Sequence, residues 1–153
     1  MAEREFQLRS DAFRNGDYIP SVHSHGSEDR SPPLRWDPPP EESRSLALRV
    51  VDIDAPKPPF THWILFDIPP DVQELREGDP GAGTPGRNDF EFPGWGGPDP
   101  PPRHGDHRLV FTLFALDVES LGLAAGARLD ELEAAIEGHV LDQAELMGRY
   151  RRD

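Results

Sequence analysis

The sequence has 153 residues and a formal net charge of −13, with 18 Pro, 14 Gly and no Cys. A chain of this length is long enough for one domain with a proper core, so we predict a single domain over residues 1–153. The negative charge disfavours binding to nucleic acid and to anionic membrane surfaces, and a chain without Cys has no disulfide or thiol chemistry. No apolar run approaches the ~20 residues that span a bilayer. These features predict a soluble cytoplasmic protein.

Apolar segments in the first two thirds of the chain predict buried strands. Leu46, Leu48 and Val50 alternate with their neighbours, so they share one face of an extended segment. Residues 63–66 are apolar on both faces, as is typical of a central strand, and residues 109–116 predict a further strand. Between them, residues 76–106 are rich in Gly and Pro, which predicts a long loop.

The end of the chain changes period. Apolar residues recur at helical spacing from about residue 129, with Asp130 as the predicted N-cap and Glu133 at capping-box distance. A second short helix is predicted to carry Leu141, Ala144 and Met147. Strands first and helices last indicate an antiparallel β body with C-terminal helices on one side.

Four polar residues near strand ends could carry chemistry. Asp52 and Asp54 lie two apart and share a face of an extended chain, His62 opens the next strand, and His107 precedes a later one. Two His and two carboxylates could hold a divalent metal ion. They could also perform acid–base catalysis in a hydrolase or lyase, or the carboxylates could orient and charge imidazoles that bind an anion. A purely structural role for all four is the remaining alternative.

Several ordered motifs resemble one known family. They are Asp52-Ile53-Asp54-Ala55-Pro56, His62-Trp63, Gly97-Pro98-x-Pro100-Pro101 and Gly105-x-His107-Arg108. Together they resemble the phosphatidylethanolamine-binding protein family, and they are most similar to its bacterial and archaeal branch, often called Raf-kinase-inhibitor-like proteins. The similarity extends from about residue 8 to residue 150.

The resemblance implies a mainly β fold, a sandwich of two antiparallel sheets with short C-terminal helices. It also implies a shallow pocket for phosphate, acetate or a phosphorylated head group, without a cofactor. The implied ligand-binding residues are Asp52, His62, Gly97, Pro100 and His107. We expect the oppositely charged Asp54 and Arg108 to pair and fix the loops. Homodimerisation and an unidentified partner protein are further expectations, whereas kinase inhibition is not carried over because a fold does not determine a function.

Three positions depart from the family pattern. Leu109 stands where the family usually has Tyr, so one polar contact to a ligand is expected to be missing. Asp99 stands at a wall position usually held by Gly or Cys, where a carboxylate would repel an anion unless it turns outward. Ile53 replaces a Pro. These departures affect the expected ligand more than the expected fold.

The imidazoles predict a dependence of anion binding on pH. We expect nearby carboxylates to raise the pKa of His62 and His107 above the ordinary ~6.5. Affinity for an anion would then fall as pH rises from about 6 to about 9. His104, in the Pro-rich loop, and His139 have no obvious partner in the sequence.

Overall fold

A computed structural model describes residues 6–152 of the chain, so residues 1–5 and 153 of the predicted domain lie outside the described part. The elements are β1 (Leu8–Arg9), a 3-10 helix (Ser21–His23), β2 (Leu34–Trp36), β3 (Ser45–Asp52), β4 (Phe60–Ile68), β5 (Glu74–Leu75), β6 (Thr84–Pro85), β7 (His107–Leu116), α1 (Leu129–Ile136) and β8 (Val140–Tyr150). No described helix is long and apolar enough to cross a membrane.

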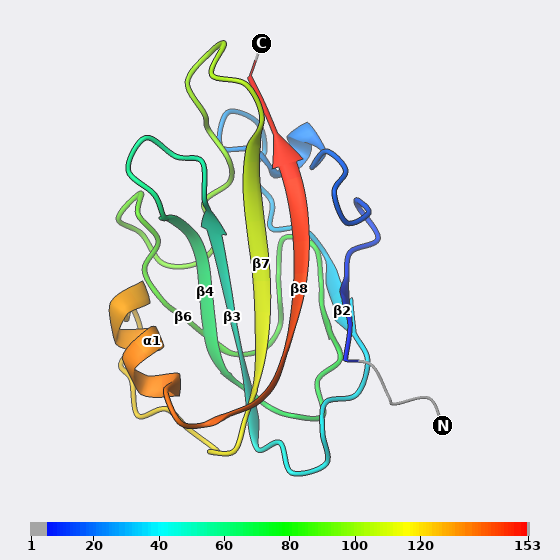
Figure 1. Cartoon of the computed structure of the whole chain (residues 1–153), viewed down its shortest axis with the longest axis vertical. Coiled ribbons are helices and arrows are strands. Elements are labelled where there is room, and N and C mark those ends of the chain that lie inside the picture. Colours follow the sequence, from blue (N-terminus) through cyan, green and yellow to red (C-terminus); the bar gives the residue numbers. More distant parts are fainter. Residues whose placement is uncertain (1–5, 153) are drawn as a thin grey trace.

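The strands form two antiparallel sheets (Figure 1). The larger sheet has the order β6-β4-β3-β7-β8, and the smaller one has the order β1-β2-β5. The predicted mainly β fold with two antiparallel sheets is confirmed.

The first hydrophobic core lies between the sheets. Leu46, Leu48 and Val50 of β3 are fully buried there, as their alternation predicts. Trp63 of β4 and Trp36 of β2 pack in the same core. Burying a Leu or Val side chain stabilises the fold by roughly 1.5–3 kcal/mol. Because residues of both sheets are buried together, this core holds the small sheet against the large one.

A second core covers the opposite face of the large sheet. Ile64 and Phe66 of β4 and Phe114 of β7 pack there with Leu132 and Ile136 of α1. Figure 1 shows α1 beside β4 and β6. The central strands therefore have apolar residues on both faces, as residues 63–66 indicated.

The predicted helix is present, but its first turn differs from the expectation. Arg128 is the N-cap, and its backbone N–H donates to Glu131 Oε1 at 3.0 Å. The prediction of Asp130 and Glu133 as the capping pair is therefore wrong by two residues. Glu133 instead pairs with Arg49 of β3 across a distance of 2.9 Å, which ties α1 to the sheet.

The predicted second helix is wrong, because residues 140–150 form strand β8. Ala144 and Leu146 are buried in the first core, while Glu145 between them is exposed. This alternation is the period of a strand. Leu141, Ala144 and Met147 are three apart and imitate a helical stripe, but Leu141 is exposed.

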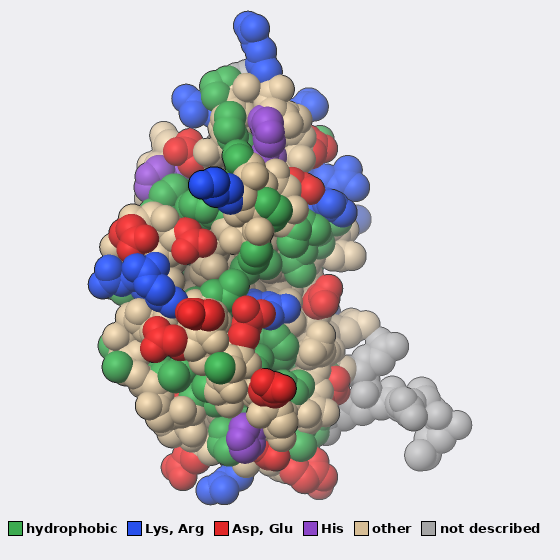
Figure 2. Space-filling model, turned by 60° about the vertical axis from the view of Figure 1, so that its left-hand side comes forward, with side chains coloured by type: hydrophobic (Ala, Val, Ile, Leu, Met, Phe, Trp, Pro, Cys, Tyr) green, Lys and Arg blue, Asp and Glu red, His purple; other side chains and the backbone are tan. Residues whose placement is uncertain are grey.

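Charged side chains of both signs are interspersed on the face shown in Figure 2. Charged side chains of the molecule form ion pairs, among them Arg128 with Glu91 at 2.6 Å and Arg108 with Asp54 at 2.9 Å. Exposed pairs of this kind contribute little stability individually, about 0–1 kcal/mol.

Candidate functional site

Two strand ends bring a carboxylate and an imidazole together. Asp52 is the last residue of β3, and His107 is the first residue of the neighbouring strand β7. Both side chains are buried, and His107 Nδ1 donates to Asp52 Oδ2 at 2.6 Å. The carboxylate can only accept when ionised, so it fixes the proton of the neutral imidazole on Nδ1.

The expected ion pair between Asp54 and Arg108 is present beside this dyad. Two guanidinium nitrogens and the backbone N–H of Arg108 donate to the Asp54 carboxylate, each at 2.9 Å. These hydrogen bonds lower the pKa of Asp54 to about 2. The pair joins the segment after β3 to the start of β7 and stands outside the pocket lining.

His62 is buried on β4, and its environment reverses the expected shift. Nδ1 lies within hydrogen-bond distance of the Gly96 carbonyl oxygen. A carbonyl can only accept, so the proton is on Nδ1 and the neutral ring keeps a lone pair on Nε2. Burial lowers the pKa of His62, more than the hydrogen bond to Gly96 and the nearby Asp52 carboxylate raise it. The expectation of a raised pKa is therefore wrong for His62, because desolvation disfavours its charged form.

These residues line a pocket of about 230 Å³. The side chains that surround it come from β3, β4, β7 and the loops between them. They belong to Asp52, Ala55, Pro56, Phe60, His62, Phe90, Asp99, Pro100, Pro101 and His107. Four of the five residues expected to bind the ligand thus surround one cavity.

The fifth, Gly97, does not line the pocket. Its N–H donates to Asp29 Oδ1 at 2.7 Å, so this group is already occupied. A Cβ added at Gly97 would lie 2.0 Å from the backbone oxygen of His23. The physical need for Gly here is the close approach of two loops.

An aromatic wall of the pocket was not predicted. Phe60 and Phe90 contact each other with ring centroids 4.9 Å apart. His25 stacks on the outer side of Phe90 at 4.3 Å and also lies 3.2 Å from the Asp29 carboxylate. Only the fold reveals this wall, because its members lie in three separate segments.

Two of the residues that depart from the family pattern, Asp99 and Leu109, lie in different environments. Asp99 lines the pocket and also lies 3.5 Å from the guanidinium of Arg152. Leu109 is fully buried in the first core, two residues along the strand from His107. Leu109 therefore gives the pocket no polar group, whereas Asp99 adds a carboxylate that lies beside the positively charged Arg152.

His104 completes a chain of three side chains. Its Nδ1 lies within hydrogen-bond distance of His107 Nε2, and the two ring centroids are 4.7 Å apart. His107 thus contacts Asp52 through one ring nitrogen and His104 through the other. The three residues come from β3, β7 and the loop before β7.

The described part of the chain contains no set of side chains that would fit the hypothesis of a metal site. No three His or acidic side chains among residues 6–152 are arranged to hold a metal ion. Both carboxylate oxygens of Asp54 are taken by Arg108.

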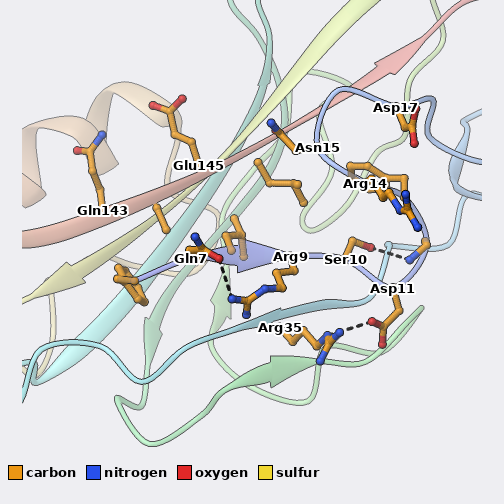
Figure 3. Close-up of a pocket in the computed structure, with 16 residues that line it drawn as sticks. Gln7, Arg9, Ser10, Asp11, Arg14, Asn15, Asp17, Arg35, Gln143 and Glu145 are labelled. Atoms are coloured by element: carbon orange, nitrogen blue, oxygen red, sulfur yellow. Dashed lines mark hydrogen bonds and ion pairs between the residues drawn. The ribbon is translucent and has the colours of Figure 1, made fainter. Parts of the chain in front are cut away.

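A larger groove of about 900 Å³ runs between residues 6–17 and β8 (Figure 3). None of the predicted site residues lines it. Two of its charged side chains, Arg35 and Asp11, pair with each other at 2.9 Å. The small pocket is therefore the candidate site.

Comparison with known proteins identifies the family to which the chain belongs. The family model described as phosphatidylethanolamine-binding protein matches residues 9–151. This chain belongs to the phosphatidylethanolamine-binding protein family. Among curated members, a UPF0098 protein of Aquifex aeolicus is 44% identical over 152 residues, covering 96% of this chain and 89% of the relative. A UPF0098 protein of Methanothermobacter thermautotrophicus is 45% identical over 151 residues, covering 95% and 98%.

Solved structures of the phosphatidylethanolamine-binding protein family have the same fold. The putative homologue CT736 from Chlamydia trachomatis superposes with a TM-score of 0.90 at 37% identity, over 97% of this chain and 98% of that one. E. coli YbcL, described as a new member of the mammalian family, gives a TM-score of 0.91 at 27% identity, over 98% and 100%.

Proposed function

We propose that the pocket binds a small anion, either phosphate or the phosphorylated head group of a larger molecule. The observation that supports this most is the buried Asp52–His107 hydrogen bond at the wall of a cavity of about 230 Å³. When His107 gains a proton, the Asp52 carboxylate stabilises its charge, and Nε2–H becomes a charge-assisted donor to an anion oxygen.

The second imidazole favours an anion that still carries a proton. Neutral His62 offers a lone pair at Nε2, because its proton is held by Gly96. Sulfate presents only acceptors, whereas a phosphate monoanion also has a hydroxyl group that can donate. Among residues 6–152, no Lys or Arg lines the pocket to add positive charge. The combination of one donor and one acceptor suits a singly charged phosphoryl group.

The pocket composition favours binding over turnover. No Ser, Thr or Lys lines it among the described residues, so the Asp52–His107 pair has no side-chain nucleophile to activate. The aromatic and proline walls, including Phe60 and Phe90, offer apolar surface to the remainder of a ligand.

Isothermal titration with inorganic phosphate and with sulfate at pH 6.0 tests the proposal. Both anions are expected to bind, with phosphate at least several-fold tighter because its hydroxyl pairs with His62. Replacing His62 by Phe is expected to abolish that preference, whereas His139→Phe, at an exposed site, should leave it unchanged. Absence of binding of both anions by the unmodified protein would refute the proposal.

A further inference from the structure

The anion-binding nitrogen of His107 is already occupied in the structure. The pocket can use only Nε2, because Nδ1 is committed to Asp52. That same Nε2 lies within hydrogen-bond distance of His104 Nδ1. A bound anion and His104 therefore compete for one position.

We propose that His104 is a built-in competitor of the anion, carried by the loop that forms one wall of the pocket. This inference rests on the proposed anion binding. The loop over residues 98–106 supplies Asp99, Pro100 and Pro101 to the pocket lining, while the His104 side chain contacts His107 from outside that lining. Binding of an anion at Nε2 requires His104 to move away.

The backbone around His104 is a turn with few attachments. Arg103 and Gly105 on either side have positive φ values of 61° and 84°. The Arg103 N–H donates to the Arg152 carbonyl at 3.1 Å, and the His104 N–H donates to the Pro101 carbonyl at 3.2 Å. His104 itself is exposed, so its ring can leave His107 without unpacking the core.

Protonation decides whether the contact persists. With both rings neutral, His104 Nδ1–H donates to the lone pair of His107 Nε2. With one added proton on His107, Nε2–H donates to the lone pair of His104 Nδ1. With both rings protonated, two N–H groups face each other and the contact breaks. Acid favours imidazolium over imidazole, so acid conditions favour separation of the two rings.

Other charged and titratable groups lie around the two rings on every neighbouring element. They are Asp52 on β3, His62 on β4, Tyr150 opposite His107 on β8, Asp99 on the loop, and the Asp54–Arg108 and Asp99–Arg152 pairs. Asp106, next to His107 in sequence, instead accepts from the Tyr18 hydroxyl.

Sulfate titrations of His104 variants test the inference, because sulfate does not change its own protonation in this range. At pH 7.5, His104→Ala is expected to bind sulfate roughly 2-fold to 10-fold more tightly than the unmodified protein, the range set by one hydrogen bond. At pH 5.0 that gain should disappear, because acid favours the doubly protonated pair, in which the two N–H groups repel each other.

His104→Gln provides a matched variant that does not titrate. Its amide can donate to or accept from His107 Nε2, so the contact persists at both pH values. We expect this variant to match the unmodified protein at pH 7.5 and to bind sulfate more weakly at pH 5.0. His139→Ala removes an exposed His at the opposite end of β7 and should change nothing.

Three outcomes would overturn the inference while leaving the proposed anion binding intact. Weaker binding by His104→Ala at both pH values would make His104 a ligand contact. A gain that persists at pH 5.0 would indicate a steric effect of the loop alone, and an unchanged affinity at pH 7.5 would remove the competition altogether. If no protein binds sulfate or phosphate, including the His139→Ala control, the proposed function fails and this inference fails with it.

Discussion

One buried carboxylate sets the hydrogen bonding of the pocket. Asp52 Oδ1 accepts the N–H of Asp54 at 2.8 Å, while Oδ2 accepts from His107. In Asp52→Asn the amide can keep the first bond, but its NH₂ group would then face His107 Nδ1–H. The variant must change the tautomer of His107 or lose the contact.

We therefore expect Asp52→Asn to weaken phosphate binding about 10-fold or more, the effect of losing a hydrogen bond to a charged group. The thermal midpoint should fall by only a few degrees. Calorimetric titration and thermal unfolding measure the two effects, with the exposed Asp117→Asn as control, since Asp117 pairs with His139 far from the pocket. A variant that does not fold would show that Asp52 is structural.

Two residues make stability depend on pH in separate ranges. The pKa of His62 is lowered by burial, so between its native and unfolded values the unfolded chain binds the extra proton. Stability due to His62 is therefore complete above about pH 6.5 and decreases as pH falls below it. The pKa of Asp54 falls from 3.8 to about 2, so its contribution is lost only between those values.

Urea unfolding at pH 7.5 and pH 5.5 isolates the His62 effect. The unmodified protein should lose more free energy of unfolding between these pH values than His62→Gln, which cannot take up a proton. His139→Gln should behave like the unmodified protein. Equal losses in all three proteins would contradict the assignment.

At the scale of elements, β8 depends on a glycine. A Cβ at Gly148 would lie 2.5 Å from Ile19 Cγ1 and 2.8 Å from Phe13 Cε2. Gly148→Ala should therefore destabilise the protein by about 1–3 kcal/mol through overpacking, which lowers the thermal midpoint by roughly 3–10 °C.

Gly26 is the matched control, because its Cβ would meet nothing within 4 Å and its φ is not positive. Gly26→Ala should be neutral or slightly stabilising. If residues 140–150 were helical, Gly148→Ala would raise stability, since Ala is the better helix former. Differential scanning calorimetry of both variants decides between these results.

Sequence patterns predicted the central strands, which are buried on both faces of the large sheet. Residues 45–52 and 63–66 form the expected strands because the sheet buries them against two cores. β8 was missed because Leu141 at its beginning is apolar yet exposed, so the apparent period was helical. Local patterns cannot separate these cases when packing against a neighbouring strand decides the conformation.

The candidate site likewise combines residues that the sequence predicted with contacts that it did not predict. Asp52 and His107 could be named from their positions near strand ends, and resemblance to the family assigned them to one pocket. Contacts such as His104 with His107 and His25 with Phe90 depend on how the loops fold back. His104 precedes His107 by only three residues, but such spacing in a loop rich in Pro and Gly predicts no contact.

At the scale of the whole molecule, the two cores share the large sheet. The three Trp residues, Trp36, Trp63 and Trp95, all lie in the first core, whereas Leu132 of α1 is buried in the second. Leu132→Ala should cost about 2–5 kcal/mol and lower the thermal midpoint by roughly 5–15 °C. Because β3, β4 and β7 contribute to both cores, we expect this shift in tryptophan fluorescence and in far-ultraviolet circular dichroism alike.

A fluorescence transition that stays in place while circular dichroism shifts would mean that the cores unfold separately. Phe114→Leu, which keeps an apolar side chain in the second core, serves as a milder control and should move both signals together by a smaller amount.

The wall of the pocket is attached to Arg152, which follows β8. Arg152 accepts the N–H of Arg103 through its carbonyl oxygen and approaches Asp99 with its guanidinium. An affinity tag or fluorescent label fused directly after this position would therefore pull on the loop that carries His104. Titrations intended to report the native pocket are best made on protein from which any such C-terminal fusion has been cleaved. The same attachment makes the C-terminal end a suitable place for a dye that reports loop movement.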